Sequence, residues 1–273
     1  MHKRLLFISF LSLILVNGYS QKANHKSSLT LSLGPSFPLG KYANKNLDDD
    51  RAGLAGIGEQ VNISYDLKLW KHISLSATLY GQRNGIKAKD IAADLSQRKY
   101  YDIGVFVSTP GFPPPVVTTY STYPNWKIDK KAWMMGSVLL GATGEFPFKP
   151  SGKLSFIAKI MAGAIYVSSP KIHGMSVTDT TEAVIDQQSK STFGVSFLLR
   201  TGLKYNINKR WSFIAGIDHF STSSITFHDV QTTLTTVKRV VGNLIYAAQQ
   251  MQTADGKQAI NTLNLNVGIG FKL

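Results

Sequence analysis

From Leu29 onward the dominant period of the chain is two: apolar residues recur at every second position, with small or polar residues between them. Within residues 261–273, for example, Leu263, Leu265 and Val267 alternate with Asn and Gly. Alternation with a period of two predicts β-strands whose two faces meet different surroundings. Eight segments carry this pattern: 29–37, 57–67, 72–82, 133–146, 154–167, 193–206, 211–221 and 261–273. We therefore expect an all-β protein.

The connections between these segments alternate strictly in length. The short ones are 68–71, 147–152 and 207–210, and the long ones are 38–56, 83–132, 168–191 and 222–260. This alternation predicts an up-and-down meander in which every short turn lies at one end, and an even number of strands then brings both termini to that end. Short periplasmic turns and long extracellular loops are typical of outer-membrane β-barrels.

Strand length also fits a membrane barrel. Each segment has roughly the 9 to 11 residues that a tilted strand needs to cross a bilayer. A sheet in hydrocarbon must close on itself, because its edge groups find no hydrogen-bond partner there. We predict a transmembrane barrel of eight antiparallel strands with long extracellular loops. Ten strands stay possible, because segments 103–108 and 232–246 are apolar enough to form two more; the alternative is hairpins or a short helix above the membrane.

The two faces of the predicted strands differ in chemistry. The face assigned to the interior carries Gly, Ser, Thr and Asn, small residues that fill the narrow lumen of an eight-stranded barrel. Aromatic residues flank the short turns, as in the aromatic girdle at a membrane interface. They are Tyr65, Trp70, Phe146, Phe148, Tyr205 and Trp211.

Residues 1–20 have the features of a secretory signal peptide. Lys3 and Arg4 precede an apolar stretch of twelve residues, and the small residues Gly18 and Ser20 follow it. The stretch is shorter than the roughly 20 apolar residues of a spanning helix, so cleavage is favoured over a membrane anchor. We expect a signal peptide at 1–20 and one barrel domain at 21–273.

Composition excludes several kinds of chemistry. The 273 residues include no cysteine, which rules out disulfides, thiol nucleophiles and thiolate metal sites. The net charge is +14, but the basic residues are scattered, so we expect no nucleic-acid partner. We expect no cofactor and no metal: Asp48, Asp49 and Asp50 lack the spacing of a calcium loop, and His173 and His228 lack ligand-spaced partners.

Short motifs add a resemblance to a family. They are residues 33–43 (LGPSFPLGKYA), 52–55 (AGLA), 208–213 (NKRWSF) and 268–273 (GIGFKL). With these, the chain resembles the small outer-membrane β-barrel domain proteins of Bacteroidetes, of the OmpA/OmpX-like barrel superfamily. The terminal strand is also similar to the signal that barrel assembly machinery reads, although Leu273 replaces the usual terminal aromatic. The resemblance implies fold and location, and it carries over no functional residue.

Charged residues on the inward face are the main candidate site. They are Glu145, Lys159, Arg200, Lys204, Asp218 and Lys272. A charge in a narrow lumen must be paired or hydrated. These residues therefore form either a structural ion-pair plug, which we favour because the lumen is narrow, or the gate of a narrow polar pathway.

A second candidate is the pair His219 and Ser221, two residues apart on the outward face of one segment. Such a pair can act as base and nucleophile, and the H-x-S pattern resembles that of outer-membrane lipid A deacylases. A carboxylate to orient the histidine is missing nearby, and only Asp229 and Asp255 follow in the long loop. A match of three residues is a weak signal without structural context, and the third member of the site is missing. We therefore expect no enzyme.

The long connections contain features that suggest partners for the protein. Their basic residues can meet lipopolysaccharide phosphates or can be merely solvated, and residues 110–117 (PGFPPPVV) predict a rigid spacer. We expect an integral outer-membrane protein with a structural or surface-interaction role, contacting lipid, lipopolysaccharide, the assembly machinery and an extracellular partner through its loops. A narrow, porin-like pore is the alternative, and a lipid A-modifying hydrolase is less favoured.

Overall fold

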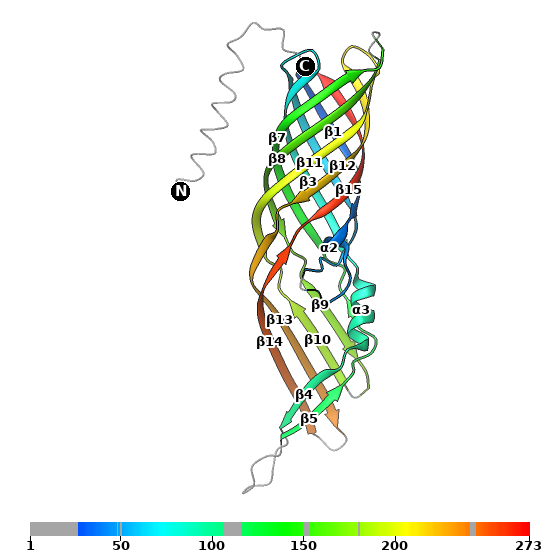
Figure 1. The fold of residues 1–273 in the computed structure, drawn as a ribbon. Helices are drawn as coiled ribbons and strands as arrows, with labels where there is room; N and C mark the ends of the chain where they lie inside the picture. The colour runs from blue at the N-terminus through cyan, green and yellow to red at the C-terminus, as the bar shows by residue number, and fades with distance from the viewer. Residues whose placement is uncertain are drawn as a thin grey trace.

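The computed structural model describes residues 27–47, 49, 51–105, 116–149, 153–179, 181–240 and 244–273. The predicted signal peptide, Asp48, Asp50 and most of the proline-rich segment lie outside these residues. The described chain forms a closed barrel that continues at one end into a smaller β-structure (Figure 1).

The barrel has eight antiparallel strands. Each pairs with the barrel strand before it and the barrel strand after it in the sequence, and the last strand closes on the first. They are β1 (Ser27–Pro38), β2 (Ala55–Lys68), β3 (Ile73–Ile86), β7 (Ala132–Pro147), β8 (Leu154–Ser168), β11 (Ser191–Asn206), β12 (Trp211–Thr222) and β15 (Asn261–Lys272). These strands confirm all eight predicted segments. The two ends of the barrel chain also meet, because the N–H of Leu273 donates to the carbonyl of Ser27 at 2.8 Å.

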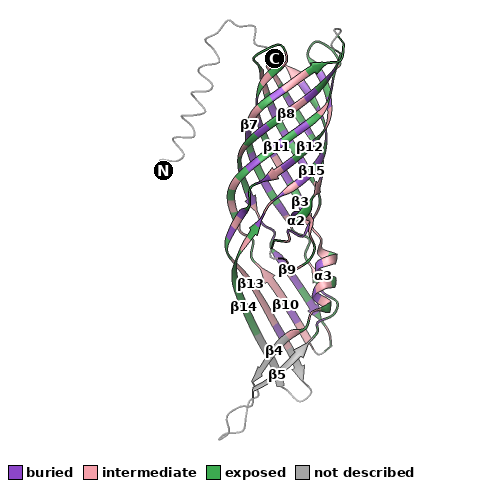
Figure 2. Cartoon of the chain, in the orientation of Figure 1, coloured by how far each residue is buried: buried purple, intermediate pink, exposed green. Residues whose placement is uncertain are grey.

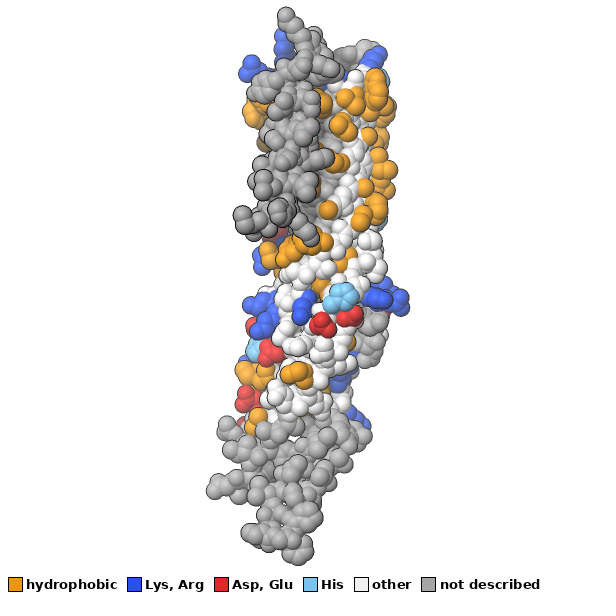
Figure 3. Space-filling model, turned by 90° about the vertical axis from the view of Figure 1, so that its left-hand side faces the viewer, with side chains coloured by type: hydrophobic (Ala, Val, Ile, Leu, Met, Phe, Trp, Pro, Cys, Tyr) orange, Lys and Arg blue, Asp and Glu red, His pale blue; other side chains and the backbone are white. Residues whose placement is uncertain are grey.

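The outer surface of the barrel is apolar. Register places Leu31 of β1 opposite Ile269 of β15, and these outward side chains are 51% and 54% exposed. Buried and exposed residues alternate along the barrel strands (Figure 2), and hydrophobic side chains gather over the barrel portion of the surface (Figure 3). All six predicted girdle aromatics are exposed at the short turns. Such a surface needs a hydrocarbon solvent.

The long connections are not simple loops: they contain the hairpins that the sequence analysis gave as an alternative, and further strands that it did not predict. Their strands form a five-stranded sheet in the order β14-β13-β10-β9-β6 and a separate hairpin, β4-β5. The bounds are β13 (Ile225–Val240), β14 (Leu244–Gln258), β10 (Thr181–Gln187), β9 (Ile172–Val177), β6 (Lys127–Ile128), β4 (Tyr100–Val105) and β5 (Val116–Ser121). The described parts of the segments considered as a ninth and tenth barrel strand thus lie in these outer hairpins, and the barrel has eight strands.

The described residues also form two helices: α2 (Gly40–Ala43), which contacts β2 and β15 of the barrel, and α3 (Ala88–Gln97), which lies beside β6 of the outer sheet. Helix α3 buries Ile91 and Leu95, which lie one turn apart, in a core with Tyr123, Trp126 and other apolar residues of the outer part. No helix among the described residues is both long and apolar enough to span a membrane. The outer part is therefore a packed β-structure with its own core.

Candidate functional site

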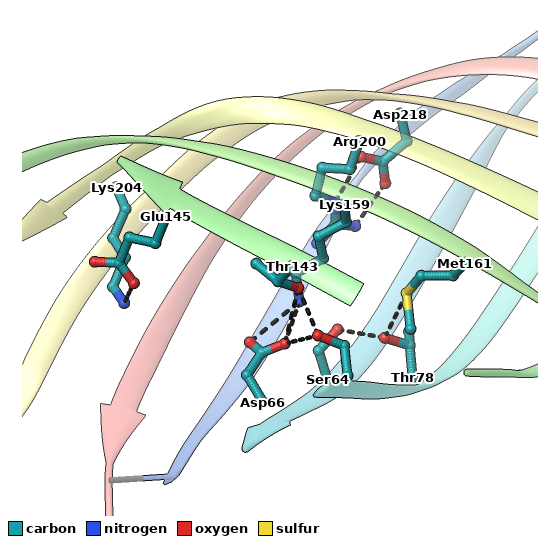
Figure 4. A network of polar contacts seen from close by, with 11 residues as sticks. Ser64, Asp66, Thr78, Thr143, Glu145, Lys159, Met161, Arg200, Lys204 and Asp218 are labelled. Atoms are coloured by element: carbon teal, nitrogen blue, oxygen red, sulfur yellow. Dashed lines mark hydrogen bonds and ion pairs between the residues drawn. The ribbon is translucent and has the colours of Figure 1, made fainter. Parts of the chain in front are cut away.

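The candidate site is the barrel lumen, where inward-facing side chains of all strands meet. The structure orients Lys159, Arg200, Lys204, Asp218 and Glu145 inward and joins them in ion pairs with one further residue, Asp66 (Figure 4). Lys272, at the end of β15, is half-buried. Parity fixes these directions, because alternate residues of a strand point to opposite faces.

Arg200 and Asp218 form the most deeply buried pair. They are direct register partners on β11 and β12, and their side chains are 2% and 0% exposed. The guanidinium Nε and one terminal nitrogen donate to the two carboxylate oxygens at 2.6 and 2.5 Å, a two-pronged geometry. Asn266 of β15 adds a third donor at 2.8 Å. The carboxylate is thus well satisfied without water.

Lys159 and Asp66 connect opposite parts of the wall. Lys159 Nζ, on β8, lies 2.9 and 3.1 Å from the two carboxylate oxygens of Asp66 on β2, two strands beyond the neighbouring β7. Ser76 and Thr143 on the intervening strands donate to the same carboxylate at 2.5 and 3.2 Å. The pair therefore spans the lumen and fastens four strands together.

The sequence analysis missed Asp66 as a charged site residue. Asp66 lies on the same strand face as Ser64 and Asn62, and this shared face was the signal that could have placed it in the lumen. Its partner could not be found in this way, because Lys159 lies 93 residues away on a strand that is not adjacent.

The third pair lies nearer to the short turns. Lys204 Nζ of β11 donates to Glu145 Oε2 of β7 at 2.8 Å, and Glu145 is the more exposed of the two. With three basic and three acidic partners, these ion pairs carry no net charge. The charges of these six lumen residues are therefore neutralised within the protein.

Large apolar side chains occupy the half of the lumen that faces the outer sheet, together with buried polar residues such as Gln82, Asn84 and Asn264. The hydroxyl of Thr78 contacts Met161 Sδ at 3.4 Å, where the polar network meets this apolar plug. Beyond it, the rings of Tyr80 and Phe220 stack with centroids 4.5 Å apart. The apolar plug consists of Tyr42, Ala55, Tyr80, Trp133, Met135, Leu139, Met161, Ile165, Val167, Leu198, Phe220, Ile225, Phe227 and Ile260. Large side chains in the lumen of an eight-stranded barrel leave little room for a continuous path.

The proposed base and nucleophile lie elsewhere. His219 is exposed on the outer face of β12 and Ser221 is half-buried. Asp255 accepts from the backbone N–H of Asp229 at 3.1 Å and lies 3.0 Å from His228 Nδ1, and these contacts lower the pKa of its carboxyl group. Among the described residues, no carboxylate is brought to His219, so the third member of a triad is missing there.

Other candidate ligands are also accounted for. Asp49 accepts from Lys41 at 2.5 Å and from the backbone N–H of Arg51, and these hydrogen bonds lower the pKa of its carboxyl group. His173 Nδ1 lies 2.7 Å from Asp186. Within the described ranges, no group of three or more His, Asp or Glu side chains is arranged to hold a metal ion.

The closed barrel, its apolar outer band and its polar, ion-paired interior define an integral outer-membrane β-barrel protein. No family model and no curated protein match the chain.

Several solved outer-membrane proteins resemble the chain in structure. Ail, the attachment invasion locus protein of Yersinia pestis, is 11% identical with a TM-score of 0.39, and the match covers 92% of this chain and 100% of Ail. A major outer membrane protein from Thermus thermophilus is 11% identical with a TM-score of 0.42, and the match covers 92% of this chain and 100% of that protein. The outer membrane protease OmpT from Escherichia coli is 6% identical with a TM-score of 0.42, and the match covers 92% of this chain and 98% of OmpT. At these values the likeness carries no argument about function.

Proposed function

We propose that this protein is a closed membrane anchor that holds a β-sheet outside the cell for structural support or surface interaction. The observation that carries the proposal is the filled lumen, with buried ion pairs in one half and the apolar plug in the other. A pathway through it would require the breaking of a buried, doubly hydrogen-bonded pair, which is costly. The barrel thus serves as a support and the outer sheet as the working part.

The outer sheet is well suited to interaction. Among the described strands, its terminal strand, β14, pairs with β13 alone; β4 lies close to part of β14 without pairing with it, and the rest of that edge offers a place for a partner strand. An extended segment can add to such an edge through main-chain hydrogen bonds. Residues 249–255 of this strand are exposed and mostly polar, which keeps the edge soluble. We propose that an extracellular partner binds there.

The remaining partners follow from the location. Outer-membrane lipid and lipopolysaccharide surround the apolar band, and the assembly machinery reads β15 during insertion. The motifs favour membership of the Bacteroidetes group. Asp255, one of the two loop carboxylates considered for His219, is instead next to His228, which argues against the hydrolase alternative.

A narrow pore is the second candidate, and one observation favours it. Five buried lumen atoms on β1, β2 and β15 have no hydrogen-bond partner within the described protein: Ser32 Oγ, Gln60 Nε2, Asn62 Oδ1, Asn264 Oδ1 and Asn266 Oδ1. Buried polar atoms are normally satisfied, and a thread of water along this wall would satisfy them. Such a thread could conduct ions.

Conductance separates the two functions. Purified protein inserted into a planar bilayer should give no stable current steps, because both halves of the lumen are filled. Reproducible steps in the wild type that change when Arg200 is replaced by alanine would establish the pore and refute the closed anchor. A known porin inserted under the same conditions is the control for reconstitution.

Labelling of single cysteines tests the display of the outer sheet. The chain has no cysteine, so each introduced thiol is unique. On intact cells, a membrane-impermeant maleimide should label Met251→Cys on β14, which is 65% exposed, but not Lys209→Cys in a short turn. Lysis should make Lys209→Cys reactive. The reverse pattern would contradict the proposed orientation.

A further inference from the structure

A row of outward-facing residues crosses five strands near the outer end of the barrel. In register, Leu33 of β1 lies beside Val61 of β2, Val61 beside Gly81 of β3, and Gly81 beside Gly136 of β7. The row ends at Tyr166 of β8. Two adjacent glycines in the middle of large side chains leave a notch in an otherwise bulky lipid-facing surface.

This notch is the floor of a groove of about 970 Å³. Leu33, Val61, Met134 and Tyr166 form its apolar sides, and each of them is about half exposed. A Cβ atom added at Gly136 would meet no atom within 4 Å, so the space above this glycine is open. The groove lies on the lipid-facing side of the barrel wall, where its natural occupant is an acyl chain.

A charged pocket of about 490 Å³ adjoins the groove on the side of the outer sheet. The two hollows share Gly58, Glu59 and Arg83, so they are continuous. Five basic residues line the pocket against two acidic ones, Glu59 and Asp90; the basic ones are Arg83, Lys87, Lys89, Lys130 and Lys131. The pocket therefore favours an anion.

The basic side chains are only partly engaged within the protein. Lys87 Nζ donates to the carbonyl of Ala43 at 2.6 Å, and Arg83 lies 3.7 Å from Glu59 in an exposed pair. Exposed pairs of this kind are weak. Lys89, Lys130 and Lys131 are exposed, and the described residues give none of them an ion pair. Positive charge at this level of the barrel is thus available to a ligand.

We propose that the groove and the pocket together bind one lipid A moiety of lipopolysaccharide. An acyl chain would lie over Gly81 and Gly136, and a phosphate of the sugar headgroup would lie among Arg83, Lys130 and Lys131. The order of the two parts fits a lipid of the outer leaflet, because the apolar groove points toward the membrane and the basic pocket toward the cell exterior. The inference rests on the proposed orientation of the barrel, which the cysteine labelling tests separately.

Binding to the purified protein in detergent, followed by native mass spectrometry, tests the site. The probes are bisphosphorylated lipid A, phosphatidylglycerol and inorganic phosphate. Replacement of Lys130 and Lys131 together by glutamate should weaken lipid A binding about tenfold or more. Each basic side chain near a phosphate adds to the binding free energy, and a glutamate in its place repels the phosphate. Gly136→Leu should also weaken it by filling the groove. The matched controls are Lys257→Glu on the outer sheet and Ala215→Leu on the outward face of β12, and both should bind as the wild type.

Several results would overturn the proposal. They are wild-type affinity in the Lys130/Lys131 double variant, an equal loss in the controls, or binding of phosphatidylglycerol or inorganic phosphate as tightly as lipid A. The shift in gel mobility between unheated and boiled samples shows that each variant is folded. If Gly136→Leu fails this check, Gly81→Leu on the neighbouring strand takes its place, with the same expected loss.

Discussion

Replacement of Arg200 by alanine should lower the free energy of unfolding by about 3–5 kcal/mol. The substitution leaves the Asp218 carboxylate fully buried, and among the described residues the Asn266 amide is its one remaining side-chain donor. Removal of one member of a buried ion pair is expensive because the other charge keeps its desolvation cost. The measurement is urea unfolding from detergent micelles, followed by tryptophan fluorescence and extrapolated linearly to zero denaturant.

Two further variants test whether the loss of stability in Arg200→Ala comes from the buried ion pair. Arg200→Met combined with Asp218→Leu removes both charges and should recover much of the loss, because no buried charge is left unpaired. Arg210→Ala, in an exposed short turn, should change stability by no more than about 0.5 kcal/mol. A single variant as stable as the wild type, or a double variant less stable than either single one, would show that the pair does not hold the lumen as described.

Replacement of Phe220 by alanine should cost about 3–5 kcal/mol, by emptying the centre of the apolar plug. Phe220 is 0% exposed and stacks on Tyr80, whose hydroxyl accepts from Asn264 at 2.9 Å. The loss should appear in the same unfolding measurement, and Phe220→Leu should lose less because it leaves a smaller cavity.

The matched control for the plug is Phe213→Ala on the same strand. Phe213 points outward and is 44% exposed, so detergent or lipid fills the space that its ring leaves. Its loss should be clearly smaller than that of Phe220→Ala. Equal losses at the two positions would mean that the interior of the barrel is no better packed than its lipid-facing surface, and the closed-anchor function would lose its main support.

The contacts in the lumen link the membrane anchor to the outer sheet that it displays. Ion pairs fasten β2, β7, β8, β11 and β12 on the side of the short turns. The apolar plug continues into Trp133, whose Nε1 donates to the carbonyl of Gly53 at 2.8 Å in the connection between β1 and β2. Ile225 and Phe227 of β13 belong to the same plug, so the outer sheet is joined to the barrel wall by packing, as a displayed binding surface requires.

The sequence by itself determined the strands and their faces. Period-two alternation is a local property, since each side chain points opposite to the one before it. Any other arrangement would place polar groups in hydrocarbon, which costs free energy. The pattern therefore indicated the inward direction of residues such as Arg200 and Asp218, and the alternation of short and long connections indicated the order of the strands.

Only the tertiary structure decided which residues meet. The pairing of Asp66 with Lys159 depends on closure of the barrel, and the glycine notch depends on the register of β3 against β7. Apart from the hairpin considered at 232–246, the outer sheet was missed because β9 and β10 are stabilised by neighbouring strands and by a shared core rather than by a bilayer, so their sequences need no strict alternation. Local patterns fix which way a side chain points, whereas contacts between distant strands depend on how the whole sheet closes.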